Sequence, residues 1–214
     1  MVLVINADTP LALCPLRQRM HRVRKQVFVD RLGWSLSVID DQFEIDAFDG
    51  ETATYLVCQE RTTSAHLASV RLLPSLGPTL LGEVFSDLCA GDVPTGPQIA
   101  EISRLCATPG LPRDKEMRAR HKLSTALIEY ALTFGVQRYT CVINVNWLPT
   151  LLAPGWACSP LGEPMEHESG RLGAFAIDIS AATLEAFLAR WGGAYPVLEL
   201  SQHQVSRKDI TYAA

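Results

Sequence analysis

Charged side chains stand inside segments of this chain that otherwise have the composition of a protein core. In residues 43–50, which read FEIDAFDG, Glu44 and Asp46 alternate with apolar residues as in a short strand, and Asp49 follows at its end. Three arginines have a similar placement within apolar segments: Arg24, Arg71 and Arg104. Arginine and aspartate are rarely buried unless they are paired. We therefore expect these distant segments to meet in one ionic network, either a structural lattice of salt bridges or a ligand site.

The bulk properties of the chain exclude several classes of protein. It has 214 residues and a formal net charge of -4, so it can form one sizeable core and has no bulk attraction to nucleic acid or to an anionic membrane. No run approaches the roughly 18 apolar residues of a membrane helix, and the start lacks the basic region of a secretory signal. The 6 cysteines and 5 histidines show no CxxC, HxxxH or HExxH spacing. We expect buried free thiols in a reducing bacterial cytoplasm, and no metal site.

The order of the predicted elements indicates an α+β fold. The hydrophobic periodicity predicts helices at about residues 10–31, 115–134 and 181–191, and a short helix within each of residues 81–89 and 146–156. Strands are predicted at residues 43–49, 53–60, 66–73, 98–107, 139–145 and 173–180, and residues 34–42 read as a loop. We expect one domain over residues 1–214, with a tail from about residue 201. It should be an α/β/α sandwich, with a mixed central sheet and helices on both faces.

A series of short motifs points to a known family. RxxVF, here RKQVF at residues 24–28, is followed by GW at 33–34, EIDAFD at 44–49, RLLPS at 71–75 and EISR at 101–104. In this order and at this spacing, the motifs resemble the acyl-homoserine-lactone synthases, the autoinducer synthases of bacterial quorum sensing. The resemblance runs from the first helix through the LG-P near Leu161 to the last strand. One departure is Leu105, where many members have an aromatic residue.

The resemblance implies a fold like that of the acetyltransferase (GNAT) superfamily, and a specific reaction. S-adenosylmethionine and an acyl thioester would give an N-acyl-homoserine lactone, methylthioadenosine and the free thiol carrier. The residues that match the family's S-adenosylmethionine site are Arg24, Phe28, Trp34, Asp46, Asp49 and Arg104. The sulfonium and ammonium of this cosubstrate need anions and aromatic faces, and its carboxylate needs an arginine. Glu44 and Arg71 are expected to support the site through ion pairs, with Glu44 either a solvated neighbour or a partner of Arg71.

Glu101 is the candidate general base. Strand alternation predicts Glu101 and Ser103 on one face and Arg104 on the other, unless a bulge re-aims one of them. The amine must lose a proton before it attacks the thioester, and Glu101 could take it directly or through one water. The alternative is that Glu101 only pairs with Arg71 or Arg104. A splayed strand edge near residues 101–106 could offer a backbone N–H to the developing oxyanion.

The acyl donor is expected to be acyl carrier protein or acyl-CoA. A basic patch opens the long helix of this otherwise acidic protein and consists of Arg113, Lys115, Arg118, Arg120 and Lys122. It suits an acidic carrier or coenzyme A phosphates, and a solvated helix start is the alternative. The Gly-rich pyrophosphate loop of ordinary acetyl-CoA acetyltransferases is absent before this helix. NWLP and LGEP, near Trp147 and Gly162, resemble the branch of the family that accepts acyl- or aroyl-CoA, while carrier protein remains slightly favoured.

The resemblance places the acyl chain along the buried strand that follows the long helix. The residues assigned to this pocket are Ser103, Cys141, Val142, Ile143 and Trp147, the last of which lines the acyl tunnel or caps the core. Relatives that make 3-oxo products have threonines at the positions of Cys141 and Ile143. Neither side chain here offers a strong hydrogen-bond donor. We therefore expect an unsubstituted, branched or aryl acyl group rather than a 3-oxo chain.

Two other functional classes remain open from the sequence. The chain could be a GNAT-type N-acyltransferase acting on another amine, or a non-catalytic acyl-thioester binder. Retention of Glu101 with Arg24 and Arg104 disfavours the second class. We expect no tightly bound cofactor besides S-adenosylmethionine as cosubstrate, no nucleic-acid or membrane partner, and a monomer or weak dimer.

Overall fold

The computed structural model describes residues 1–6, 9, 14–153, 155–192 and 195–200. The chain divides into two compact parts, which are treated separately. The first part comprises Met1–Arg71, Arg104–Ala126 and the residues from Pro196 onward, and the second comprises Leu72–Ser103 and Leu127–Tyr195. The tail predicted from about residue 201 lies outside the described residues. Among those described, no helix combines the length and apolar character needed to span a membrane.

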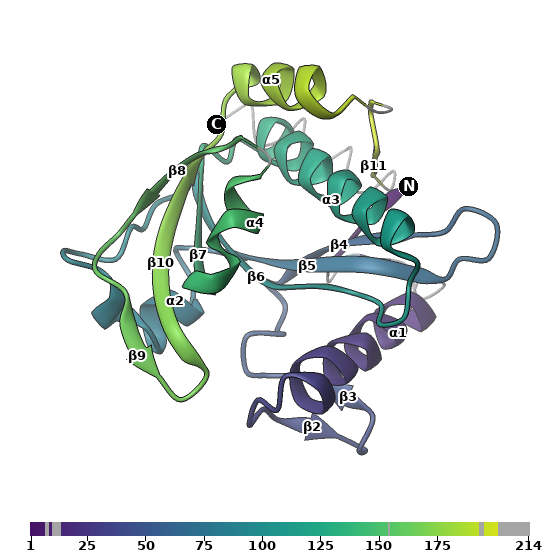
Figure 1. The fold of residues 1–214 in the computed structure, drawn as a ribbon, viewed down its shortest axis with the longest axis horizontal. Helices are drawn as coiled ribbons and strands as arrows, with labels where there is room; N and C mark the ends of the chain where they lie inside the picture. Colours follow the sequence, from purple (N-terminus) through teal and green to yellow (C-terminus); the bar gives the residue numbers. More distant parts are fainter. Residues whose placement is uncertain (7–8, 10–13, 154, 193–194, 201–214) are drawn as a thin grey trace. The chain divides into compact units, whose positions relative to one another are not determined.

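The first part contains a sheet whose strands follow the order β11–β1–β4–β5–β6. These strands are β11 (Leu198–Glu199), β1 (Val2–Ile5), β4 (Thr54–Gln59), β5 (His66–Pro74) and β6 (Ile99–Ala107), and the last two also contribute residues to the second part. β1 runs antiparallel to β4 and parallel to β11. Every residue of β4 is buried. Figure 1 shows α1 on one face of β4 and β5 and the start of α3 (Arg113–Phe134) on the other, so helices cover both faces as predicted.

The first helix changes type along its length. α1 (Cys14–Arg24) buries Leu16, Met20 and Val23, the apolar stripe seen in the sequence, and continues as the π-helical segment η2 (Lys25–Arg31). Residues 10–13 of the predicted helix lie outside the described residues. The N–H of Leu32 donates to the carbonyl of Val27, five residues back, as a π-helix requires. The helix therefore ends where predicted, but its last turns are wider than an α-helix.

The acidic segment is mostly a turn, which corrects the strand predicted over residues 43–49. A hairpin of β2 (Val38–Ile39) and β3 (Phe43–Glu44) comes first, so the predicted loop at 34–42 contains a short strand. After Glu44 the chain turns, because Asp46 Oδ1 accepts the N–H of Phe48 and the Asp46 carbonyl accepts the N–H of Asp49. Aspartate favours such turns by bonding its own backbone two residues on. Asp46 and Asp49 thus lie on a turn rather than on one strand face.

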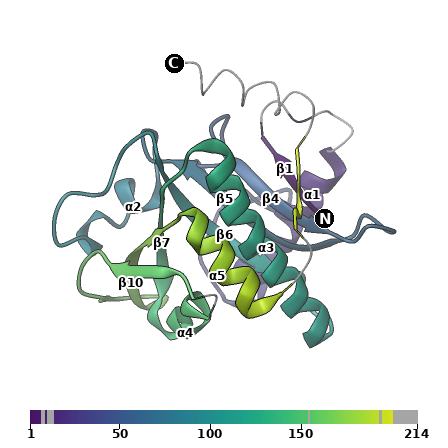
Figure 2. The same cartoon turned by 90° about the horizontal axis from the view of Figure 1, so that it is seen from above.

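The second part is a mixed sheet with the strand order β5–β6–β7–β10–β8. β7 (Arg138–Asn144) is parallel to β6, and β10 (Gly170–Asp178) is antiparallel to β7, to β8 (Ala157–Pro160) and to β9 (Met165–His167). The remaining elements are α2 (Leu80–Glu83), η3 (Ser86–Leu88), η4 (Val145–Trp147), α4 (Leu148–Leu152) and α5 (Ala181–Trp191). Figure 2 shows elements of this part from above, among them β7, β10, α4 and α5. Mixed strands with covering helices confirm the predicted α+β class.

The core of the second part has one apolar cluster that bears on the site. Leu81 of α2 and Leu88 of η3 pack against Leu172 and Ala174 of β10, with Val142 of β7 at their edge. On the other face of β7, the buried Tyr139 donates its hydroxyl hydrogen to the Leu127 carbonyl of α3, at 2.9 Å. The two faces of β7 are therefore covered by different elements.

Candidate active site

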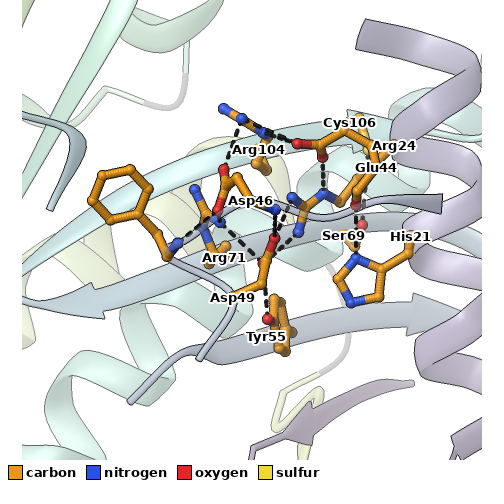
Figure 3. A network of polar contacts seen from close by, with 11 residues as sticks. His21, Arg24, Glu44, Asp46, Asp49, Tyr55, Ser69, Arg71, Arg104 and Cys106 are labelled. Atoms are coloured by element: carbon orange, nitrogen blue, oxygen red, sulfur yellow. Dashed lines mark hydrogen bonds and ion pairs between the residues drawn. The ribbon is translucent and has the colours of Figure 1, made fainter. Parts of the chain in front are cut away.

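The charged residues singled out in the sequence meet in the first part of the chain. Figure 3 shows this arginine–carboxylate cluster, which comprises Arg24, Arg71, Arg104, Glu44, Asp46 and Asp49. Its members come from α1, β5, β6, β3 and the turn after β3. The network expected from the sequence therefore forms, with as many arginines as carboxylates.

Arg24 is the centre of the cluster. Its Nε donates to Glu44 Oε2 at 2.5 Å, and its two terminal nitrogens donate to the two oxygens of Asp49 at 2.7 and 2.8 Å. Such a fork of two parallel hydrogen bonds is the strongest geometry for an arginine–carboxylate pair. Arg24 therefore holds the hairpin and the turn after it against the end of α1.

Arg71 and Arg104 complete the cluster. Arg71 Nη1 lies 2.5 Å from Asp46 Oδ1 and 3.0 Å from Asp49 Oδ1. Arg104 Nη2 lies 3.1 Å from Glu44 Oε1 and 2.8 Å from Asp46 Oδ2. Glu44, which could have been a solvated neighbour, is instead fully buried and pairs with Arg24 and Arg104. Each carboxylate therefore bridges two arginines.

Burial makes this pairing necessary. Buried ions lose several kcal/mol of hydration, and only close partners offset that loss. Burial lowers the pKa of the Arg24 guanidinium, but Asp49 and Glu44 outweigh it and raise this pKa above its usual value. Burial raises the pKa of Asp49, yet hydrogen bonds and charge from Arg24 hold it well below its usual range. The side chain of Asp46 is 15% exposed, against 0% for Glu44 and 1% for Asp49. Asp46 is thus the carboxylate of the cluster that meets the surface.

Two residues that the sequence reasoning missed support the carboxylates. The Tyr55 hydroxyl donates to Asp49 Oδ1 at 2.8 Å. His21 Nδ1 lies 2.9 Å from the Glu44 carbonyl and donates to it, because a carbonyl can only accept. The His21 ring also meets the Tyr55 ring edge-on. The available signal was a tyrosine within a mostly apolar predicted strand, since a buried phenol needs a hydrogen-bond partner.

Aromatic rings adjoin the cluster through Arg104. Phe28 and Trp34 stack with their ring centroids 5.1 Å apart, and the Arg104 guanidinium lies 5.5 Å from the centroid of Phe28. Phe28 is buried in η2, and Trp34 follows directly after the turn at Gly33. The two aromatic residues assigned from the sequence therefore form one surface, linked to Asp46 by Arg104.

The backbone of β6 is strained at Arg104. Its φ is +53°, a left-handed conformation that costs a residue with a side chain roughly 1–3 kcal/mol. Such a residue interrupts the strand alternation, as the bulge considered from the sequence would do. The ion pairs of Arg104 with Glu44 and Asp46 hold this conformation in place.

Glu101 belongs to the second part of the chain. Its carboxylate accepts the N–H of Leu80 at 3.1 Å and the N–H of Leu81 at 2.7 Å, at the start of α2, and the residue is 1% exposed. β6 pairs with β7 from Ile99 to Ile102, and this register sets Glu101 beside Thr140. The candidate base is therefore anchored by backbone donors, which leaves its position well defined.

The residues predicted to line the acyl pocket do not share one environment. Cys141 and Ile143 lie on the Tyr139 face of β7, toward α3, because alternate residues of a strand point the same way. Val142 lies on the opposite face, which is also the face of Glu101 and Thr140. Ser103 is partly buried, and Trp147 is 49% exposed on η4. Cys141 and Ile143 therefore face away from Glu101, and their influence on the acyl substituent stays a prediction.

The basic patch at the start of α3 is largely neutralised by its neighbours. Lys115 pairs with Glu60 at 2.7 Å, and the chain also forms the pairs Arg118–Asp114 and Arg120–Glu116. For Arg113 and Lys122 the described part of the chain contains no such pair. The patch therefore presents less free positive charge than the sequence indicates.

The cysteines are all free thiols, and burial raises the pKa of Cys106 to about 11. Within the described ranges, no group of three or more histidine, cysteine, aspartate or glutamate residues is arranged to hold a metal ion. A thiol with a raised pKa is a poor nucleophile at neutral pH. The chemistry of the site therefore rests on its charged and aromatic groups.

The chain is similar to known synthases over most of its length. The autoinducer synthase family model matches residues 14–187. The chain is 32% identical to the acyl-homoserine-lactone synthase of Pseudomonas aeruginosa, over 81% of this chain and 86% of the relative. It is 31% identical to the isovaleryl-homoserine lactone synthase of Bradyrhizobium diazoefficiens, over 82% of this chain and 78% of the relative.

Solved structures agree with this assignment. The structure of BjaI, a CoA-dependent acyl-homoserine lactone synthase, with SAM and isopentyl-CoA superposes with a TM-score of 0.85 at 26% identity, covering 98% of this chain and 99% of that one. A Lactobacillus plantarum chain described as an N-acetyltransferase shares the fold at a TM-score of 0.56 and 14% identity, covering 84% of this chain and 99% of that one. The acetyltransferase-like fold expected from the motifs is thus confirmed. The chain belongs to the autoinducer synthase family and is an acyltransferase of the acyl-homoserine-lactone synthase type.

Proposed function

We propose that the protein transfers the acyl group of a coenzyme A thioester to the amine of S-adenosylmethionine and closes the product to an N-acyl-homoserine lactone. The observation that carries the proposal is the arginine–carboxylate cluster. Asp46 is its partly exposed carboxylate, and Arg104 links Asp46 to the stacked rings of Phe28 and Trp34. Anion, cation and aromatic face therefore occur together, as a sulfonium amino acid requires.

The charge balance of the cluster suits this cosubstrate. S-adenosylmethionine brings a sulfonium, an ammonium and a carboxylate, and the cluster is neutral by itself because its arginines and carboxylates are equal in number. Asp46 faces one of the cationic groups, and Arg104, the arginine with the most exposed side chain, takes the carboxylate. The buried ion pairs of Arg24 with Glu44 and Asp49 hold the β3 hairpin and the turn that carries Asp46 in position. This division gives Asp46 and Arg104 the direct contacts and the other four charges a supporting role.

The acyl transfer needs a base for the ammonium proton. Glu101 lies three residues before Arg104 on the same strand, β6, so the base and the cluster share one structural element. Once deprotonated, the amine nitrogen attacks the thioester carbonyl carbon, the carbon–sulfur bond breaks, and the coenzyme A thiolate leaves and takes up a proton. Glu101 accepts the ammonium proton, which makes it a general base.

Lactone closure then proceeds within the acylated cosubstrate. A carboxylate oxygen of the methionyl group attacks the carbon that bears the sulfonium, and the carbon–sulfur bond breaks to release methylthioadenosine. No acid is required, because the leaving sulfide is already activated by its positive charge. Positioning the two ends of one molecule supplies most of the acceleration.

Two observations support coenzyme A over a carrier protein as the donor. Most cations of the α3 patch are paired within this chain, which leaves Arg113 and Lys122 as a small target for an acidic protein. A similar solved synthase, BjaI, is described as CoA-dependent, and the expectation from NWLP and LGEP points the same way. We extend the proposal to a branched or unsubstituted acyl group, in line with the isovaleryl-homoserine lactone synthase among the relatives.

The test is a reconstituted reaction of the purified protein with S-adenosylmethionine and a matched set of donors. Isovaleryl, hexanoyl and 3-oxo-hexanoyl groups are each supplied on coenzyme A and on acyl carrier protein, and mass spectrometry follows both the lactone and methylthioadenosine. We expect the coenzyme A donors without a 3-oxo group to have the highest kcat/KM. Preference for the carrier protein would overturn the donor assignment, and acylated amine without methylthioadenosine would point to an ordinary N-acyltransferase.

A further inference from the structure

The glycine of the LG-P motif at residues 161–164 lies against the main chain of another segment. A methyl group on the Cα of Gly162 would lie 2.5 Å from the Leu88 carbonyl oxygen and 2.8 Å from the Ala90 nitrogen. Both neighbours are backbone atoms, so they cannot rotate away as the end of a side chain could. Only a residue without a side chain permits so close an approach. The proposed reaction assigns no role to this contact.

Hydrogen bonds fix the same contact to the sheet. The carbonyl of Leu161 accepts the N–H of Ala90 at 2.9 Å, and the N–H of Leu161 donates to the carbonyl of Ala174 on β10, also at 2.9 Å. The side chain of Leu161 packs against the apolar cluster of α2, η3 and β10. Residues 88–90 are therefore tied to the sheet through the motif.

The α2–η3 segment, residues 79–90, connects this contact to Glu101. The Phe85 N–H donates to the Leu80 carbonyl, so the end of α2 continues directly into η3. At the start of α2, the N–H groups of Leu80 and Leu81 donate to the two oxygens of Glu101 at 3.1 and 2.7 Å. One end of the segment therefore carries the donors that hold the base, and the motif fixes the other end. Because protein interiors are close-packed and transmit strain, a shift at one end reaches the other.

We propose that Gly162 is a positioning residue: its missing side chain fixes the α2–η3 segment, whose backbone donors hold Glu101 in place as the base. A side chain at position 162 must push residues 88–90 away, because their backbone atoms occupy its space. The segment then shifts, and the two hydrogen bonds to the carboxylate weaken. Gly162 acts through Glu101 and needs no contact with a substrate. The proposal rests on the proposed function, in which Glu101 takes the ammonium proton.

The experiment compares Gly162→Ala with Gly91→Ala. Gly91 is the matched control, because it directly follows Ala90 and a methyl group there would meet no residue except its chain neighbours within 4 Å. We expect Gly162→Ala to lower kcat about 10- to 100-fold, since a misplacement of about 1 Å can cost about 10²-fold, with both KM values within about threefold of wild type. Gly91→Ala should stay within about twofold of the wild-type kcat and KM values.

Leu80→Pro tests the link between Gly162 and the base. Proline at the first position of α2 removes an N–H that bonds Glu101 and suits the helix start, and Thr79 before it is already extended. If both changes act on the same donors, the double variant should lose less kcat than the two single losses multiplied together. The acid limb of the kcat–pH profile should also move to higher pH in both single variants, by about 0.5 to 1 pH unit, because backbone N–H groups favour the ionised carboxylate.

Amide hydrogen exchange measures the displacement without turnover. The two α2 amides that hold Glu101 should exchange about tenfold faster in Gly162→Ala than in Gly91→Ala. A folded Gly162→Ala protein with wild-type kcat would overturn the proposal, as would multiplied losses with an unmoved pH profile. If Gly162→Ala does not fold, Ala90→Pro removes the hydrogen bond to Leu161 at the same contact, and an unmoved profile there refutes the proposal. Faster exchange, together with a wild-type protein that forms neither lactone nor methylthioadenosine, would instead refute the proposed function.

Discussion

Replacement of Asp46 by asparagine tests the cosubstrate site most directly. The change removes one negative charge at the exposed edge of the cluster and keeps an oxygen that can still accept the N–H of Phe48, so the turn should survive. Two opposite unit charges about 4 Å apart attract by about 4 kcal/mol at an effective dielectric near 20. Asp46 already shares its charge between Arg71 and Arg104. We therefore expect the substitution to reduce the binding free energy of S-adenosylmethionine by only a third to two thirds of this attraction.

A loss of about 1.4–2.8 kcal/mol corresponds to a 10- to 100-fold higher KM for S-adenosylmethionine. The thioester has no cation at this position, so its KM should change less than threefold. Steady-state kinetics with each substrate varied against a saturating partner measures both values. Asp178→Asn is the control, because Asp178 forms an exposed ion pair with Arg138 outside the cluster. Equal changes in the two KM values, or an unchanged KM for S-adenosylmethionine, would refute the reasoning.

Three further predictions concern the base, the buried charges and pH. Glu101→Gln should lower kcat by roughly 10²- to 10⁴-fold while both substrates still bind, measured by turnover and by calorimetric titration; near-wild-type kcat would exclude it as the base. Arg24→Met leaves the buried carboxylates of Glu44 and Asp49 without their main partner, and it should lower the free energy of unfolding by about 3–5 kcal/mol in urea denaturation. Arg138→Met on the surface is the control and should lower it by less than about 1 kcal/mol. Burial lowers the pKa values of His21 and His66 to about 4, from 6.5. Between pH 6.5 and 4 both imidazoles are therefore neutral in the folded protein, whereas in the unfolded chain they bind protons. Protonation of the unfolded chain lowers the free energy of unfolding as the pH falls from 6.5 toward 4, by up to roughly 3 kcal/mol for each histidine. Above pH 6.5 this loss is absent. Urea unfolding at pH 7.5 and 5 measures this loss, which His66→Gln should reduce; an unchanged pH slope would contradict it.

The sequence by itself determined the elements with strong periodicity. The stripe of Leu16, Met20 and Val23 predicted the first helix, and alternating or continuous apolar runs predicted β4, β5, β6, β7 and β10. Gly135 ends α3 with a φ of +73°, as its position after the last apolar residue indicated. These features depend on neighbouring residues, and a local pattern contains that information. The motifs likewise predicted which charged residues would gather.

The tertiary structure decided how those residues pair and which way they face. Glu44 bonds Arg24, 20 residues away, and Arg104, 60 residues away, rather than being a solvated neighbour. The predicted strand at 43–49 gave way to a turn because the side chain of Asp46 bonds its own backbone and the arginines. Thr140, rather than Cys141 or Ile143, lies beside Glu101, since the register between two strands is set by packing across the whole sheet. Partner choice over such separations depends on which surfaces meet in the fold, and no local pattern contains it.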